Sequence, residues 1–155
     1  MKQGITRRKR RMRIDKFVLD CNIWISYLIT KRHEKLAEMI NENELIVYSC
    51  DELLNEITKV LMYPHLTKYN ISPIFAAAYI KDVTLHQELI HPIKRYLPND
   101  ENDDYLIALA LQTSSGFITS GDTDILSEKE NLEKKYKKLK ILTKKEFEEM
   151  FVLGD

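Results

Sequence analysis

The chain has 155 residues, and its 44% hydrophobic and 31% charged residues are typical of a globular domain with one sizeable core. Its net charge is zero, but residues 1–13 carry seven basic residues and no acid, so the rest of the chain carries −7. No apolar run approaches the roughly 18 residues of a membrane-spanning helix. Cys21 and Cys50 do not have the number or spacing of a disulfide framework or a zinc site.

The N-terminal segment differs in composition from everything that follows it. We expect residues 1–13 to form a disordered basic arm, because blocks of like charge repel one another, and residues 14–151 to form the folded domain. The arm either contacts nucleic-acid phosphates or has no function. Its basic start lacks a signal-peptide core, and we expect a cytoplasmic protein with reduced cysteines and no membrane partner.

Strands and helices alternate along the chain. Apolar runs predict four strands, at residues 14–19, 44–49, 116–120 and 138–142. Between and after them, helices are predicted from residue 22 into the thirties, at 50–63, 72–90 and 103–112, after 127 and after 143. Capping-box spacing supports three of these starts, at Ser49 and Glu52, Ser127 and Glu130, and Thr143 and Glu146.

This order predicts an α/β fold with a mostly parallel sheet and right-handed crossovers. Pro64 ends one helix, and Ser72 with Pro73 begins the next, so an α-hairpin is expected between the second and third strands. Residues 91–99, which contain two prolines, are expected to form a connector. In open parallel sheets, ligands bind outside the carboxyl ends of the strands, and functional residues are expected there.

Four acidic positions stand out: three follow or abut the carboxyl ends of strands, and the fourth is one crossover helix away. Asp20 follows the first strand, and Asp122 follows the third after a glycine turn. Glu56 lies at the rim of the apolar stripe of the second predicted helix, where a purely solvated side chain is less expected. Asp104 opens the apolar helix after the connector; it is preferred to its neighbour Asp103 because helix phase turns it toward protein.

Each acid alone also fits a cap or a turn, but together they predict one acidic pocket. Crowded carboxylates repel unless a cation compensates, and Mg²⁺ or Mn²⁺ prefers oxygen ligands, so a site for one of these ions is expected. The sequence has no glycine-rich phosphate loop and no Ser-His-Asp arrangement. Metal-assisted hydrolysis of phosphodiesters is therefore the favoured chemistry.

Four segments in order, VLDCNIWISYL, ELLNEITKVL, DDYLIALAL and FITSGDTDIL, resemble the PIN-domain ribonucleases, especially the branch regarded as toxins of toxin–antitoxin systems. The resemblance covers roughly residues 14 to 147. It implies a three-layer α/β/α fold, cleavage of RNA with Mg²⁺ or Mn²⁺, a homodimer and a cognate antitoxin. It places the family's catalytic acids on Asp20, Glu56, Asp104 and Asp122.

The same resemblance assigns metal ligation to Asp20, Asp104, Asp122 and Asp124, with supporting roles for Asn22, Thr119 and Asp103. Two alternatives stay open: a non-catalytic PIN-like module that binds RNA or protein, and a metal-dependent phosphatase. The phosphatase is disfavoured because such enzymes commonly carry a second Asp where this chain has Asn22. The basic segments 31–35 and 134–140 either contact RNA or are solvated helix faces, and the second interpretation is favoured.

Overall fold

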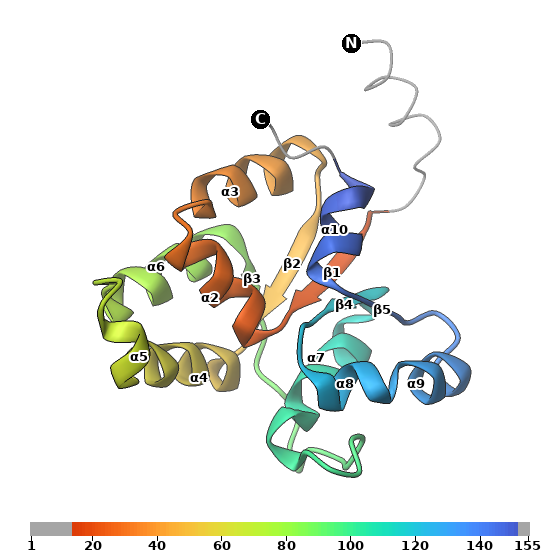
Figure 1. Ribbon diagram of the computed structural model, residues 1–155. Coiled ribbons are helices and arrows are strands. Elements are labelled where there is room, and N and C mark those ends of the chain that lie inside the picture. The colour runs from red at the N-terminus through yellow and green to blue at the C-terminus, as the bar shows by residue number, and fades with distance from the viewer. Residues whose placement is uncertain (1–13, 152–155) are drawn as a thin grey trace, which may run out of the picture.

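A computed structural model describes residues 14–151, which form a three-layer α/β/α fold around a parallel sheet (Figure 1). The basic arm predicted for residues 1–13 lies outside the described residues. All neighbouring strands are parallel, in the order β3-β2-β1-β4-β5. The strands are β1 (Lys16–Leu19), β2 (Ile46–Ser49), β3 (Leu85–His86), β4 (Phe117–Thr119) and β5 (Lys140–Leu142).

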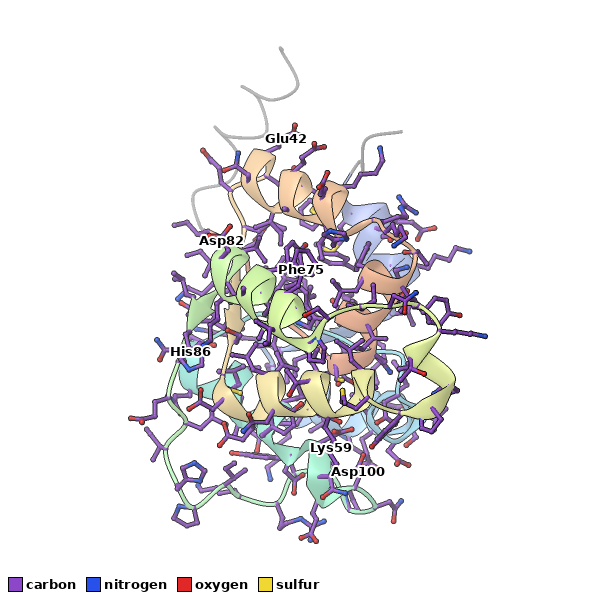
Figure 2. The ribbon with its side chains drawn as sticks, turned by 90° about the vertical axis from the view of Figure 1, so that its left-hand side faces the viewer. Glu42, Lys59, Phe75, Asp82, His86 and Asp100 are labelled. Atoms are coloured by element: carbon purple, nitrogen blue, oxygen red, sulfur yellow. The ribbon has the colours of Figure 1, made fainter. Side chains whose placement is uncertain are left out.

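Helices connect the strands and cover the sheet. They are α2 (Cys21–Ile29), α3 (His33–Glu42), α4 (Asp51–Leu61), α5 (Pro64–Thr67), α6 (Pro73–Val83), η1 (Glu101–Asp103), α7 (Asp104–Thr113), α8 (Thr123–Ser127), α9 (Lys129–Lys135) and α10 (Lys144–Met150). Figure 2 shows α3, α6 and α4 one below another, marked by Glu42, Phe75 and Lys59. Across residues 14–151, none of these helices combines the length and apolar character needed to cross a bilayer.

The core is centred on β1. Phe17, Val18 and Leu19 are completely buried, as expected for a parallel strand covered on both faces. In the register of β1 with β4, Phe17 lies opposite Phe117, and their rings stack with centroids 4.6 Å apart. The continuous apolar run that predicted this strand therefore reflects burial on both faces.

The topology places a change in the direction of winding at the middle of the sheet. The chain builds β1, β2 and β3 toward one edge, then returns through α7 to add β4 and β5 on the other side of β1. The direction of winding thus changes between β1 and β4. In open α/β sheets this switch point is where ligands bind, because the loops at the carboxyl ends diverge there.

The predicted helices 22–thirties and 72–90 each differ from what the structure shows. The first is two helices, α2 and α3, separated by a turn in which Lys31 has a φ of 59°. The second ends at Val83, and the residues after it form a short edge strand, β3, that the sequence did not predict. The predicted opening of that helix is confirmed, since Ser72 accepts a bond from the Phe75 N–H.

The three predicted capping boxes also have different outcomes. The box at Thr143 and Glu146 is present at the start of α10. The one at Ser49 is wrong: the N-cap of α4 is Cys50, and the Ser49 hydroxyl lies 2.8 Å from that of Thr84. The box at Ser127 is wrong as well, because that residue ends α8, a helix the sequence did not predict, and its hydroxyl donates to the Asp124 carbonyl.

Candidate metal centre

Asp20 leaves the central strand directly and becomes the N-cap of α2. Its side chain is buried, and its two oxygens accept hydrogen bonds from the Cys21 backbone N–H and the Ser120 hydroxyl, both at 2.6 Å. A buried carboxylate needs such donors, because losing water without replacement is costly. These two bonds fix the carboxylate at the carboxyl end of β1.

Ser120 links the end of β4 to the end of β1. Its hydroxyl donates to Asp20 and accepts from the Asp122 backbone N–H at 3.0 Å, while the Asp20 N–H donates to the Thr119 carbonyl at 2.9 Å. Asp122 is in turn the N-cap of α8, and its side chain accepts from the Asp124 N–H at 2.8 Å. The loop after β4 is therefore held against the start of α2 at the switch point.

Glu56 reaches the same end of the sheet from α4. Its Oε1 accepts a hydrogen bond from the hydroxyl of Tyr105, a buried residue in the first turn of α7. Burial and the negative charge of Glu56 raise the pKa of Tyr105, so the phenol keeps its proton and acts as a donor. Glu56 itself is partly exposed, with one oxygen held by the protein.

Five carboxylates form one continuous cluster. Asp20, Glu56 and Asp103 each bring an oxygen to within 4.8 Å of the others, and Asp100, Asp103 and Asp122 do the same. Asp103 is buried and belongs to both groups. We call these five residues the carboxylate cluster. Its members come from the ends of β1 and β4, from α4 and from η1, which lie far apart in the sequence.

Asp104, the neighbour preferred from the sequence, is turned toward a different partner. Its buried carboxylate accepts bonds from Arg95 Nε at 2.7 Å and from the backbone N–H groups of Tyr96 at 2.9 Å and Leu97 at 2.7 Å. Helix phase thus correctly predicts that Asp104 faces protein. Because successive residues of a helical turn point about 100° apart, only its neighbour Asp103 faces the cluster.

Crowding and burial perturb the two most buried acids of the cluster. Burial, followed by hydrogen bonds with Asp122 and Asp100 and the charges of Asp20 and Glu56, raises the pKa of Asp103 to about 10. In the protein alone, Asp103 therefore keeps a proton at neutral pH and shares it with the neighbouring carboxylates. A cation that takes the place of this proton restores the charge of the carboxylate.

Asp20 is perturbed less because it has two donors. Its pKa is raised to about 6, with burial as the largest influence and smaller increases from the charges of Glu56 and Asp122. The hydrogen bonds from Ser120 and Cys21 act in the opposite direction, since they stabilise the ionised form. Asp20 is thus largely ionised at neutral pH.

The donor set fits a hard divalent cation. Both groups of ligands consist of carboxylate oxygens alone, and Mg²⁺ and Mn²⁺ prefer such ligands, whereas zinc sites usually include His or Cys. The raised pKa of Asp103 follows from the same geometry, because burial and the neighbouring carboxylates disfavour its ionised form unless a cation compensates the charge. The residues that would hold the ion are those of the carboxylate cluster.

The remaining predicted residues lie around this cluster in different ways. Asn22 is exposed, and its Oδ1 accepts a bond from the Gly121 N–H at 3.4 Å. Thr119 is fully buried, and its hydroxyl has no hydrogen-bond partner within residues 14–151. Asp124 belongs to neither group of carboxylates and contributes its backbone N–H to the Asp122 cap.

Sequence reasoning missed three contributors. Asp100 is not among the predicted site residues, although it lies three residues before Asp103, a spacing that one tight turn brings to the same side. Ser120 ends the third predicted strand, next to the expected ligand-binding edge. This position was the only feature of the sequence that indicated a role for Ser120 in the site. No feature of the sequence indicated a role for Tyr105, because its hydrogen bond to Glu56 requires α4 to lie beside α7.

Two comparisons with known proteins bear on this site. Residues 16–124 match the model of the family described as PIN domain. The chain is also similar to the uncharacterized protein MJ1680 of Methanocaldococcus jannaschii, with 31% identity over 144 residues that cover 88% of this chain and 91% of the relative. The residues matched to the family begin at β1 and end in α8, and they include all five members of the carboxylate cluster.

Proposed function

The chain belongs to the PIN-domain family, and we propose that it is a divalent-metal-dependent endoribonuclease that hydrolyses phosphodiester bonds of RNA. The observation that carries this proposal is the carboxylate cluster at the switch point between β1 and β4. PIN domains are typically metal-dependent nucleases, and the cluster supplies the oxygen ligands that such chemistry requires. The proposed ions are Mg²⁺ or Mn²⁺.

In the proposed reaction, some residues of the cluster bind the metal ion and Glu56 accepts a proton. Asp20 and Asp103 would hold an ion in the first group of ligands, and Asp100, Asp103 and Asp122 would hold an ion in the second. A bound dication supplies Lewis acidity, which orients the attacking water and offsets the charge on the phosphate. Glu56 keeps Oε1 bonded to the Tyr105 hydroxyl and uses Oε2 to accept a proton from that water.

The decisive test compares RNA cleavage by the wild type and by Asp20→Asn in Mg²⁺, in Mn²⁺ and in chelator. We expect cleavage with either ion, none in chelator, and a loss of more than about a hundredfold in the variant, because it removes a direct ligand. Asp82→Asn is the matched control, since Asp82 is exposed on α6, away from the cluster (Figure 2). Circular dichroism checks that both variants are folded.

Full activity of Asp20→Asn, or cleavage that survives chelation, would refute the proposal. A small phosphate monoester assayed beside the RNA separates the nuclease from the phosphatase considered above, because only a phosphatase hydrolyses it efficiently. Binding of RNA without cleavage under every condition would instead favour the non-catalytic module.

We further propose that this nuclease is the toxin of a toxin–antitoxin pair. In this proposal the toxin acts in the cytoplasm and forms a homodimer. The support is the sequence resemblance to that branch of the family. Induced expression in a bacterial host tests it with the same two proteins: the wild type should stop growth and Asp20→Asn should not. Growth unaffected by the wild type would contradict the toxin role while leaving the nuclease proposal intact.

A further inference from the structure

Positive charge is concentrated in one segment of an otherwise acidic domain. Residues 14–151 contain 17 basic and 23 acidic residues, yet residues 134–145 contain seven lysines and no acid. Five of the seven lie between residues 134 and 140, a stretch we call the lysine segment. All five are exposed, and none forms an ion pair within the described part of the chain; they are Lys134, Lys135, Lys137, Lys138 and Lys140.

The lysine segment includes an aromatic contact with the connector. Tyr136 packs edge-to-face against Tyr96 with ring centroids 6.2 Å apart, and Lys135 Nζ lies 5.5 Å from the centre of the Tyr136 ring. Both tyrosines are partly exposed. The pair thus joins the end of α9 to the connector that precedes η1, and it combines aromatic rings with free cationic groups on one surface.

Two sets of contacts connect this surface to the segments that carry the carboxylate cluster. The backbone N–H of Tyr96 donates to Asp104 at 2.9 Å, and Asp104 is the residue after Asp103 of the cluster. From the other side, α9 follows α8, whose N-cap is Asp122, and the two helices are in contact (Figure 1). Tyr96 thus lies near the cluster, whereas Lys140 begins β5 at the amino end of the sheet, so an RNA chain that extends from the cluster past Tyr96 reaches the lysine segment.

We propose that the lysine segment, with Tyr136 and Tyr96, binds single-stranded RNA as it enters the carboxylate cluster. The inference rests on the proposed function and names the surface that holds its substrate. Lysine ammonium groups contact the phosphates, and the tyrosine rings contact bases. The strand is single because bases paired in a duplex do not present their faces to a protein ring.

The negative charge of the rest of the domain explains why RNA would bind at this positively charged surface. The cluster and the rest of the domain repel a polyanion, so a substrate needs a compensating positive region close to the site. An acidic peptide would satisfy the lysines equally well, but it has no aromatic face to match the two tyrosines. The aromatic pair therefore favours nucleic acid over an acidic protein partner.

The first test measures binding of a fluorescent oligouridylate by anisotropy, in chelator, as a function of salt. Lys135→Gln/Lys138→Gln should weaken binding roughly tenfold at low salt, and the slope of log affinity against log salt should fall by about 0.7 for each phosphate that the variant no longer neutralises. Lys68→Gln/Lys81→Gln is the matched control, because Lys68 lies over the Tyr69 ring in a similar local arrangement elsewhere. The control should bind like the wild type.

The second test isolates the aromatic contribution. Tyr136→Leu should weaken binding at least about fivefold without changing the salt slope, since it removes a ring and no charge. Tyr136→Phe keeps the ring and should keep the affinity. Circular dichroism and thermal unfolding of each variant show whether it is folded before its affinity is compared.

Three outcomes would overturn the inference: equal losses in the two lysine pairs, unchanged binding in Tyr136→Leu, or equal competition by polyglutamate or by duplex RNA of the same charge. Because binding is measured in chelator, failure of the inference is distinguishable from failure of the proposed function. Cleavage without dependence on the lysine segment would remove the inference alone. Binding that depends on it, without cleavage in any metal, would remove only the proposed function.

Discussion

The Tyr105 hydroxyl holds Glu56 at the edge of the carboxylate cluster. Its hydrogen bond orients a carboxylate that is otherwise partly exposed at the end of a flexible side chain. A bond to a charged acceptor contributes roughly 1.5–3 kcal/mol, so its removal should be measurable in the reaction proposed for Glu56. Tyr105 is thus a positioning residue, because it acts through Glu56 and has no assigned contact with substrate.

Tyr105→Phe should reduce the rate of RNA cleavage roughly tenfold or more, because Glu56 loses the donor that orients it. The buried ring remains, so the free energy of unfolding should change little. Single-turnover cleavage and urea unfolding measure the two effects separately. Tyr63→Phe, at an exposed tyrosine, is the control. Cleavage at the wild-type rate in Tyr105→Phe would show that this contact does not position Glu56.

At the scale of elements, the connector between β3 and η1 is held by side-chain and backbone bonds to the first turn of α7. Asp104 accepts two backbone N–H groups and the Arg95 side chain, and Arg95 also donates to the Leu97 carbonyl at 2.9 Å. The connector ends at Asp100, which belongs to the carboxylate cluster. Adjacent acids therefore have separate tasks: Asp104 anchors the segment, and Asp103 faces the cluster.

The variants Asp103→Asn and Asp104→Asn should separate these tasks. Asp104→Asn weakens charge-assisted bonds and should lower the free energy of unfolding by about 1–3 kcal/mol. Asp103→Asn resembles the protonated form and should keep its stability, yet it should abolish Mn²⁺ binding. Urea unfolding in chelator and titration calorimetry with Mn²⁺ provide the two measurements. Loss of Mn²⁺ binding with unchanged stability in Asp104→Asn would instead support Asp104 as the ligand.

The sequence predicted elements whose signal is local. The strand at β1 was recognisable because burial on both faces requires consecutive apolar residues, and α10 was recognisable by a capping box complete within four residues. By contrast, β3 has two exposed residues and pairs with β2 through its backbone alone, which leaves no side-chain pattern. The Ser49 capping box failed because its hydroxyl contacts Thr84, 35 positions away.

In the candidate site, too, features that depend on neighbouring residues were predictable from the sequence, and features that depend on distant residues were not. The position after β1 predicted that Asp20 lies at the ligand-binding edge, and the structure places it there. The choice between Asp103 and Asp104 depended on the residue at which η1 gives way to α7, a boundary that periodicity does not define. The contribution of Ser120 depends on β4 lying beside β1, which is a property of the topology.

At the scale of the whole molecule, the carboxylate cluster opposes folding when no cation is bound. Asp20 and Asp103 have pKa values raised to about 6 and about 10 in the folded protein, against an ordinary value of 3.8. Between the ordinary and the raised values, the folded state binds more protons than the unfolded chain. The free energy of unfolding therefore falls as pH rises. Both groups contribute to this fall up to about pH 6, and Asp103 alone continues to contribute up to about pH 10.

Urea unfolding in chelator should show this loss of stability from about pH 5 to about pH 9, with a slope of up to roughly 1.4 kcal/mol per pH unit for each group. Mn²⁺ added at the alkaline end should restore stability, because it binds only the folded cluster. Asp103→Asn should flatten the profile above about pH 6. Stability that is constant or rises over this range in chelator would contradict the raised pKa of Asp103.

The bond between Ser120 and Asp20 joins residues 100 positions apart. During translation, the first half of the chain emerges with Asp20 and Glu56 but without β4, which pairs with β1 beside them. A nascent polypeptide is consequently unable to assemble this centre until β4 has left the ribosome and paired with β1.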